Sequence, residues 1–162
     1  MGRDIALTGL VAARGATLSL EDCRAAREED RVEGVEPLGP TARALRFSAL
    51  VDRADPPYAA RWVTVESADG AYAASLPIEE MLELALVVYE VDDAPLDPER
   101  GGPFRLVLPG YRDPCANVRD LGRVDFADVP GRDTRPSRQE EGPACQASAE
   151  TEGSEAAGGE EG

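Results

Sequence analysis

The sequence contains no lysine and no histidine. All 17 basic residues are arginine, they face 32 aspartate and glutamate residues, and the net charge is −15. The lack of histidine excludes histidine-based acid–base catalysis, Ser–His or Cys–His nucleophiles and histidine-containing zinc sites. An acidic chain is also a poor partner for nucleic acid and for anionic membranes, because both require basic side chains. We therefore expect no nucleic acid partner.

Long apolar runs are absent too. No run approaches the roughly 20 residues that a membrane-spanning helix needs, and the first ten residues lack the shape of a signal peptide. We expect no membrane insertion and a cytoplasmic location. The replacement of lysine by arginine, together with the excess of acids, predicts a halophilic source with a GC-rich genome.

Cysteine is rare, with Cys23, Cys115 and Cys145 only. The number is odd and no pair has CxxC spacing, so a disulfide framework is not expected. The spacing instead predicts small buried or incidental thiols.

The last part of the chain lacks core-forming residues. After Val129 there is no valine, isoleucine, leucine or aromatic residue, and glutamate, glycine, alanine, serine and proline prevail. Such a segment buries too little apolar surface to offset the entropy lost on ordering. The sequence predicts a domain over residues 1–127 and a disordered acidic tail over residues 128–162.

Within the domain, strand patterns outnumber helical ones. Apolar alternation predicts strands over residues 5–11, 31–35, 62–66, 71–75, 86–91, 104–108 and 121–126. Ser19 and Asp22 form a capping-box pattern before a short helix that ends near Ala26. A second short helix is predicted over residues 48–53 and a third after Pro77, and Gly39-Pro40 is expected to break the chain. The pattern indicates an α+β domain of mixed β-sheets with short helices.

One stretch, from Trp62 to Phe126, follows a recognisable order of strand, turn, short helix, Gly-Gly-Pro loop and strand. The residues that carry this order are Ser67, Asp69, Gly70, Ser75, Leu76, Pro77, Pro95, Leu96, Gly102, Pro103, Arg105, Leu106, Val107, Pro109, Gly110, Val118, Arg119, Leu121, Gly122, Arg123 and Val124. They resemble the oxidoreductase molybdopterin-binding domain of the sulfite oxidase family. The resemblance covers residues 4 to 126 and is specific from Trp62 to Val124.

The resemblance implies a cysteine that this chain lacks. In the family, the strand after the first helix delivers a thiolate to molybdenum, a metal for which a soft sulfur ligand is suited. Here that strand falls on residues 31–36, which contain no sulfur, and Cys23 comes too early. We therefore assign no catalytic residue and no metal ligand. We expect no cofactor, or a molybdenum–molybdopterin if the family function is retained.

The resemblance also implies contacts to the pterin phosphate. It places Arg119, Asn117, Arg105 and Asp69 as candidate cofactor-binding residues. Arg119 stands where the family has a lysine and can still hold phosphate. Asp120 stands where the family has a tryptophan and would repel an anion, and Ala116 replaces a basic residue.

Some of these side chains have simpler interpretations. Asp69 can form its turn with its own carboxylate. Arg43 and Arg46, which the resemblance places near the mouth of a site, are basic side chains on an acidic protein and can pair with local carboxylates.

Three functions follow from this interpretation. The first is a divergent family member without molybdenum redox catalysis that keeps a ligand- or anion-binding cleft. The second is an active oxidoreductase subunit whose thiolate comes from Cys115. The third is a structural or regulatory partner of a redox protein.

Overall fold

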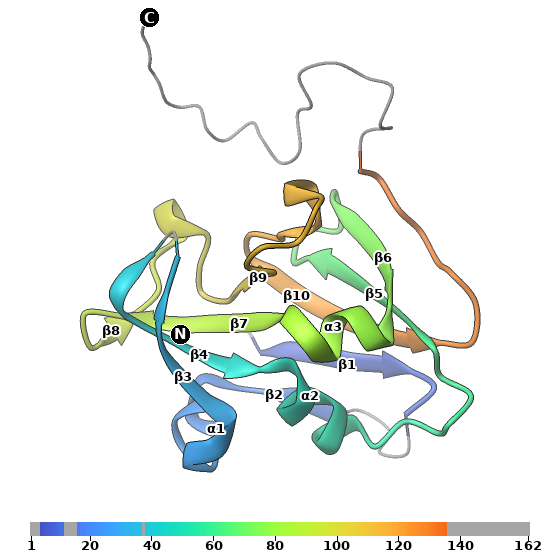
Figure 1. Cartoon of the computed structure of the whole chain (residues 1–162), viewed down its shortest axis with the longest axis horizontal. Coiled ribbons are helices and arrows are strands. Elements are labelled where there is room, and N and C mark those ends of the chain that lie inside the picture. Colours follow the sequence, from blue (N-terminus) through green and yellow to red (C-terminus); the bar gives the residue numbers. More distant parts are fainter. Residues whose placement is uncertain (1–3, 12–15, 37, 136–162) are drawn as a thin grey trace, which may run out of the picture.

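Two five-stranded sheets pack face to face in the computed structural model, which describes residues 4–11, 16–36 and 38–135. The first sheet has the order β2-β1-β10-β5-β6 (Figure 1). Its strands are β1 (Ile5–Gly9), β2 (Ala16–Leu18), β5 (Trp62–Ser67), β6 (Ala73–Pro77) and β10 (Leu121–Ala127). The pair β1 and β10 is parallel and the other pairs are antiparallel, so the sheet is mixed.

The second sheet is antiparallel throughout. It contains β3 (Arg31–Val35), β4 (Gly39–Arg46), β7 (Leu86–Val91) and β8 (Ala94–Pro95) in that order, and β9 (Arg105–Val107) also pairs with β7. β7 therefore lies at the centre of this sheet, and β9 brings the Gly-Gly-Pro loop against it.

The helices are short, as predicted. They are α1 (Leu20–Arg24), α2 (Phe47–Ala54) and α3 (Ile78–Leu84). The capping box before α1 is confirmed: Ser19 Oγ accepts from the Asp22 amide, and Asp22 Oδ2 accepts from the Ser19 amide. The α+β class is confirmed as well.

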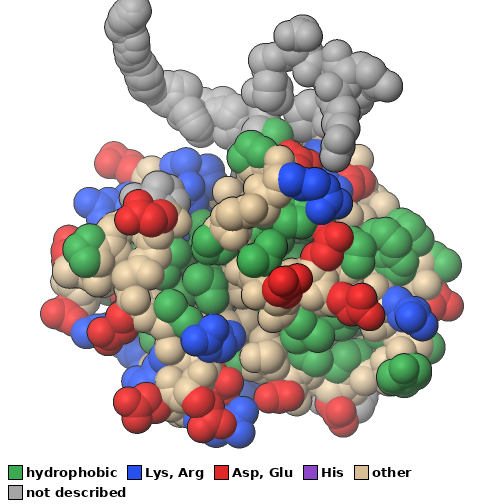
Figure 2. All heavy atoms as spheres, in the orientation of Figure 1, with side chains coloured by type: hydrophobic (Ala, Val, Ile, Leu, Met, Phe, Trp, Pro, Cys, Tyr) green, Lys and Arg blue, Asp and Glu red, His purple; other side chains and the backbone are tan. Residues whose placement is uncertain are grey.

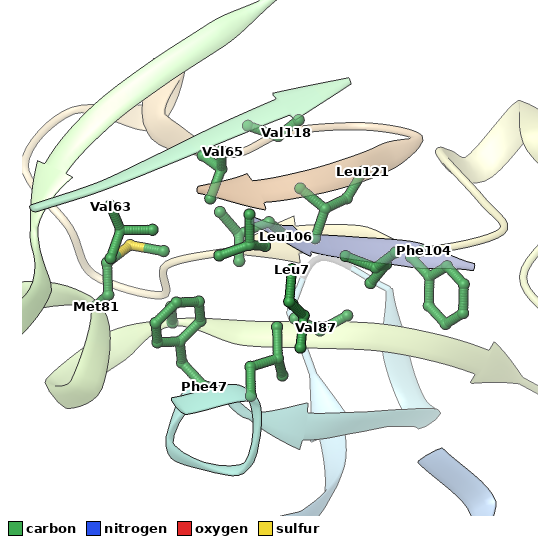
Figure 3. Close-up of a cluster of buried hydrophobic side chains, with 14 of the residues drawn as sticks. Leu7, Phe47, Val63, Val65, Met81, Val87, Phe104, Leu106, Val118 and Leu121 are labelled. Atoms are coloured by element: carbon green, nitrogen blue, oxygen red, sulfur yellow. The ribbon is translucent and has the colours of Figure 1, made fainter. Parts of the chain in front are cut away.

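The main hydrophobic core lies between the two sheets. Figure 3 shows Leu7, Val63, Val65, Val87 and Leu106 pointing into it from both sheets. α2 adds Phe47, whose ring lies 6.4 Å from that of Phe126, and α3 adds Met81. A buried aromatic or aliphatic side chain of this size contributes about 1.5–3 kcal/mol by leaving water.

A second apolar cluster lies on the outer face of the second sheet. It consists of Val35, Ala42, Ala44, Val88, Val91, Leu96 and Val107, all buried. Along β7, Val87 faces the main core and Val88 faces this cluster, which explains the continuous apolar run that the sequence shows there. The cluster joins the end of β3 to β9.

Three of the described strands were not predicted: β2, β4 and β8. Gly39-Pro40 was expected to break the chain, and this was wrong, since β4 begins at Gly39. The register between β3 and β4 shifts between Glu33 and Val35, opposite the start of β4. Such irregular strand ends tolerate a proline that lacks an amide N–H.

The chain beyond β10 continues along the edge strand β6, where Figure 1 draws it as an orange segment. We call residues 128–135 the strap. Gly131 donates to Ser75 Oγ over 2.9 Å, Thr134 donates to the Ala73 carbonyl over 2.9 Å, and the Ala73 amide donates to Thr134 Oγ1 over 3.0 Å. The domain limit at residue 127 stays a prediction. The predicted tail from residue 136 onward, with Cys145, lies outside the described residues.

Over the described ranges, no helix has the length and apolar content to cross a membrane.

Candidate functional site

The Gly-Gly-Pro loop follows a short 3-10 helix, η2 (Pro98–Arg100), that Asp97 caps by accepting from the Arg100 amide. Gly101 then adopts φ +95°, a left-handed conformation that favours glycine. At Gly102, a Cβ would lie 1.9 Å from the Leu96 carbonyl oxygen. The geometry of this tight loop therefore requires glycine at both positions, independently of any role in ligand binding.

Two of the predicted residues, Arg105 and Arg119, flank Gly101. A Cβ on Gly101 would lie 2.9 Å from Arg105 Cδ and 3.3 Å from Arg119 Cβ. Arg119 Nη2 donates to the Glu99 carbonyl over 2.7 Å, and Arg105 Nη1 donates to the Arg100 carbonyl over 3.1 Å. Both guanidinium groups thus gather at the end of η2, and both side chains remain half-buried.

Arg100 is a basic residue of this loop that the sequence analysis missed. Its side chain is exposed and it directly precedes Gly101. Its position between Asp97 and the two glycines is the sequence feature that could have indicated it. We call Arg100, Arg105 and Arg119 the arginine cluster. Figure 2 shows several arginine side chains at the upper left of the visible face, where Figure 1 draws the segment after β8.

Asn117 lies on the strand-like segment that carries Arg119. This segment pairs with β9 through one antiparallel bridge, Leu106 to Val118, with hydrogen bonds of 2.8 and 2.9 Å. The side-chain oxygen of Asn117 accepts from the Leu108 amide over 2.8 Å. Asn117 thus helps to close the loop between β9 and Arg119.

Asp69 occupies the turn between β5 and β6. Its Oδ1 accepts from Ser67 Oγ over 2.7 Å and from the Ala71 amide over 3.0 Å, which is the turn-forming role that its sequence also allowed. The turn touches the arginine-bearing segment through the Ala68 amide, which donates to the Asp120 carbonyl over 2.7 Å. Asp69 is therefore a neighbour of this loop, while Arg105 and Arg119 flank the glycine itself.

Asp120 adopts φ 52°, and its amide donates to the Gly101 carbonyl over 2.7 Å. The residue that replaces the family's tryptophan thus holds the Gly101 turn through its backbone.

The segment 31–36 forms β3 and one residue beyond, and it lines a separate cleft of about 580 Å³ with α1 and β7. At this cleft the buried carboxylate of Glu90 accepts from Arg24 Nε over 2.6 Å and from Arg43 Nη1 over 3.1 Å. Arg43 also lies 2.8 Å from Asp93, so it pairs with local carboxylates. Arg46 donates instead to the backbone carbonyl of Glu29.

Neither described cysteine offers a thiolate to this region. Cys23 is fully buried in the main core, and burial, followed by the charge of Asp22, raises its pKa to about 12. Cys115 is disulfide-bonded, in contrast to the expectation of unpaired thiols. An active centre built on Cys115 would first require reduction of that bond. Among the described residues, no group of three or more cysteine, aspartate or glutamate side chains is arranged to hold a metal ion.

A second cleft, of about 520 Å³, was not predicted. Trp62, Tyr111 and Pro130 contribute to its apolar lining. Arg135 reaches into it and binds two carboxylates, with Nη1 3.0 Å from Asp113 and Nη2 2.6 Å from Asp133. Residues 131–135 contain no apolar pattern that would have predicted this cleft, because hydrogen bonds and ion pairs hold them in place.

The charges in this cleft shift two pKa values. Burial alone would raise the pKa of Asp133, but hydrogen bonds from Arg135 and from the Ser75 amide lower it below its ordinary value. The hydrogen bond to Asp133 raises the pKa of Arg135, which stays charged.

These two packed sheets, with a Gly-Gly-Pro loop between a short helix and a strand, define a molybdopterin-binding type of α+β domain. Residues 43–132 match the family described as the oxidoreductase molybdopterin binding domain. The chain belongs to this family, as its sequence resemblance indicated.

Among solved structures, the chain is similar to the sulfane dehydrogenase SoxCD from Paracoccus pantotrophus, with a TM-score of 0.63 and 20% identity. The similarity covers 79% of this chain and 39% of that chain, so the two share a fold over well under half of the larger protein. No curated protein matches the chain.

The residues present do not fit the family's cysteine-ligated molybdenum. β3 carries no sulfur, Cys23 is buried in the core, and Cys115 is disulfide-bonded. The chemistry that the described site does offer is the arginine cluster, whose guanidinium groups match the geometry of phosphate and carboxylate oxygens.

Proposed function

We propose that this chain is a divergent molybdopterin-binding-family domain that binds an anionic, phosphate-bearing ligand at the arginine cluster and does not use molybdenum redox catalysis. One observation carries the proposal: Arg105 and Arg119 are held side by side at Gly101, while β3 supplies no thiolate.

The role of each side chain follows from its contacts. Arg119 and Arg105 each use a nitrogen to hold a carbonyl at the end of η2, which fixes both guanidinium groups. Fixed guanidinium groups lose little further entropy when they bind an anion. Asn117 holds the segment that carries Arg119 by accepting from the Leu108 amide.

The absence of a fitting thiolate supports the loss of redox catalysis. A molybdenum centre in this family requires sulfur from the protein, and the sequence of β3 contains none. The acidic surroundings argue for a weak site, because the chain as a whole carries −15 and repels anions at long range.

The test has two parts on the full chain. Protein made in a host that synthesises the molybdenum cofactor is assayed for molybdenum, and we expect far less than one metal per chain. Pyrophosphate is then titrated at low salt while the amide and arginine side-chain resonances are followed by NMR. We expect shifts at Gly101, Arg105 and Arg119.

Variants test whether the pyrophosphate shifts arise from binding at the arginine cluster. Arg119→Ala should abolish the pyrophosphate shifts and Arg119→Lys should restore part of them, because a lysine keeps the charge. Arg61→Ala, which removes an exposed arginine outside the cluster, is the matched control and should change nothing. About one molybdenum per chain, or pyrophosphate shifts that survive Arg119→Ala, would contradict the proposal.

An interaction with a redox protein stays a prediction. Its support is the family to which the chain belongs, whose description is that of an oxidoreductase domain. Co-purification from the native source with a haem or flavin protein would be the direct measurement.

A further inference from the structure

A β-bulge brings two consecutive residues of β7, Tyr89 and Glu90, to the same cleft. Arg43 on β4 lies opposite Glu90, but the next residue, Ala44, lies opposite Val88. Tyr89 therefore has no opposite residue, and bulges of this kind re-aim side chains and are common next to functional sites. Both Tyr89 and Glu90 line the cleft of about 580 Å³ between α1, β3 and β7, which we call the β3 cleft.

Ion pairs that satisfy one another form part of the lining of the β3 cleft. The Glu90 side chain is only 5% exposed, and its carboxylate binds Arg24 and Arg43. Arg43 also lies 3.5 Å from Glu33 and 2.8 Å from Asp93. A buried carboxylate that lost its charged partners would be strongly destabilising. These arginines are therefore held in place by Glu90 and give the cleft its shape.

Tyr89 differs from the other buried tyrosines. The Tyr72 hydroxyl donates to the Cys115 carbonyl, and the Tyr111 hydroxyl donates to the Glu80 carboxylate. Tyr89 is 1% exposed, yet its hydroxyl has no hydrogen bond with any residue in the described ranges. Because a buried tyrosine hydroxyl usually has a hydrogen-bond partner, this group is available to a ligand in the cleft.

The charges around this hydroxyl decide its protonation state. Burial raises the pKa of Tyr89, and the charges of Cys23 and Glu90 act in the same direction, whereas Arg31 and Arg43 act against them. The hydroxyl therefore keeps its proton near neutral pH. It lies close enough to both arginines to feel their charge, so it can donate to an anionic group that binds beside them.

Two charges of opposite sign remain at the rim of the β3 cleft. Arg31 begins β3, and Glu28 begins the 3-10 helix η1 (Glu28–Asp30). Both are exposed, both line the cleft, and neither forms an ion pair with another residue of the described chain. The three arginines of the lining are balanced by three glutamates: Arg24, Arg31 and Arg43 against Glu28, Glu33 and Glu90. A balanced lining favours a ligand without net charge.

We propose that the β3 cleft binds a small zwitterion of the amino acid class. The ligand carboxylate binds the Arg31 guanidinium and accepts from the Tyr89 hydroxyl, and the ligand ammonium group faces the Glu28 carboxylate. Arginine binds carboxylates in a bidentate manner, which favours this orientation. The cleft shares no residue with the arginine cluster, and the inference does not depend on ligand binding there.

The size of the cleft fits such a ligand. Small-molecule sites in proteins have volumes of about 300–1,000 Å³, and the β3 cleft has about 580 Å³. Partly apolar side chains can be accommodated as well, because Val32 contributes to the lining. The geometry fixes the amino acid head group and leaves the choice of side chain to experiment.

The experiment first finds the ligand. Each of the twenty common L-amino acids is screened on the full chain by saturation-transfer NMR, and the tightest binder is measured by calorimetry. We expect a Kd below about 1 mM. Two analogues of that amino acid are then measured, one without the ammonium group and one with an amide in place of the carboxylate. Each should bind at least about fivefold more weakly, because each loses a charged contact.

Variants then locate the site. Tyr89→Phe and Arg31→Ala should each weaken the amino acid about tenfold, since each removes a hydrogen bond to a charged group. Glu28→Gln should weaken it about threefold and leave the analogue without the ammonium group unaffected. The matched controls, all exposed and outside the cleft, should change nothing: Tyr58→Phe, Arg61→Ala and Glu79→Gln.

Stability gives an independent measurement. Because the Tyr89 hydroxyl has no described partner, Tyr89→Phe should keep the melting temperature of wild type, whereas Tyr72→Phe should lower it. If Tyr89→Phe fails to fold, Arg31→Ala and the two analogues decide the question.

Three results would overturn the proposal. The first is that none of the amino acids binds. The second is binding that survives Arg31→Ala unchanged, which would place the ligand elsewhere. The third is equal affinity for the amino acid and its analogue without the ammonium group, which would mean that the cleft recognises a carboxylate alone.

Discussion

Arg135 Nη1 donates to Asp113 Oδ2 over 3.0 Å, and this contact ties the strap to the loop that leads to Arg119. The same guanidinium group uses Nε and Nη2 to bind Asp133, and Nη2 also donates to the Ser75 carbonyl. Only 18% of the Arg135 side chain is exposed. A single residue thus connects the strap, the edge strand β6 and the loop after β9.

Replacing Arg135 by alanine should destabilise the protein by about 1–3 kcal/mol, because two partly buried carboxylates would lose their charged partner. The measurement is urea unfolding followed by circular dichroism. Arg132→Ala is the matched control: Arg132 is about half exposed and donates to the Gly70 carbonyl, so its loss should cost less than about 1 kcal/mol. Equal costs for the two variants would show that Arg135 does not anchor the strap.

Two truncations should differ in stability. A chain that ends at Arg135 keeps the strap, and under reducing conditions, which open the Cys115 disulfide in the full chain as well, its unfolding free energy should lie within about 0.5 kcal/mol of the full chain. A chain that ends at Pro130 loses the bonds that Gly131, Asp133, Thr134 and Arg135 make with β6, and its melting temperature should fall by several degrees. If the two truncated chains have the same melting temperature, the strap contributes nothing to the stability of the domain.

The carboxylate of Asp133 predicts a loss of stability in acid. Its pKa in the folded state lies below the ordinary value, so its contribution is present above about pH 4 and is lost as the pH falls through the folded pKa. Wild type and Asp133→Asn should differ in unfolding free energy by a constant amount between about pH 7 and 5, and the difference should shrink as the pH falls below the ordinary aspartate pKa of about 4. A difference in unfolding free energy that does not shrink in acid would contradict the stabilising role of the Asp133 carboxylate.

Much of the fold could be predicted from the sequence, because the information is local in most elements. A continuous apolar run predicts β7, and Ser19 and Asp22 form the capping-box pattern that predicts the start of α1. β4 could not be predicted, since Gly39-Pro40 signals a break and only pairing with β3 and β7 makes it a strand.

The candidate site likewise has features that could be predicted from the sequence and features that could not. Arg105 and Arg119 could be selected from family spacing, but their approach to Gly101 depends on the pairing of Leu106 with Val118, which no local pattern encodes. The strap was missed for a different reason. Asp133 and Arg135 are polar, and their order comes from partners that are distant in sequence, Ser75 and Asp113.

Cys23 should resist thiol reagents in the native protein. It is fully buried, and burial together with the charge of Asp22 raises its pKa to about 12, so almost no reactive thiolate forms near neutral pH. Native protein treated with iodoacetamide and digested should yield an unmodified Cys23 peptide by mass spectrometry, whereas protein unfolded in urea should yield the modified one. Rapid modification without denaturant would mean that the core opens around α1.

Stability should rise with salt, because the folded domain over residues 1–126 concentrates 23 acidic residues against 14 arginines. Such self-repulsion destabilises the compact state, and the unfolded chain relieves it by spreading the charges apart. At about 1 M ionic strength the screening length falls to about 3 Å, which leaves repulsion only between adjacent carboxylates. The melting temperature should therefore increase from low to high NaCl.

The control must separate screening from the general effect of excluded solutes, which also favours burial. Melting in NaCl is therefore compared with melting in sucrose at the same water activity. A larger gain in NaCl would support charge screening and the salt adaptation that the lysine-free acidic composition predicts. Equal gains in the two solutes would assign the effect to solute exclusion, and no gain in NaCl would leave a GC-rich genome as the explanation for the missing lysines.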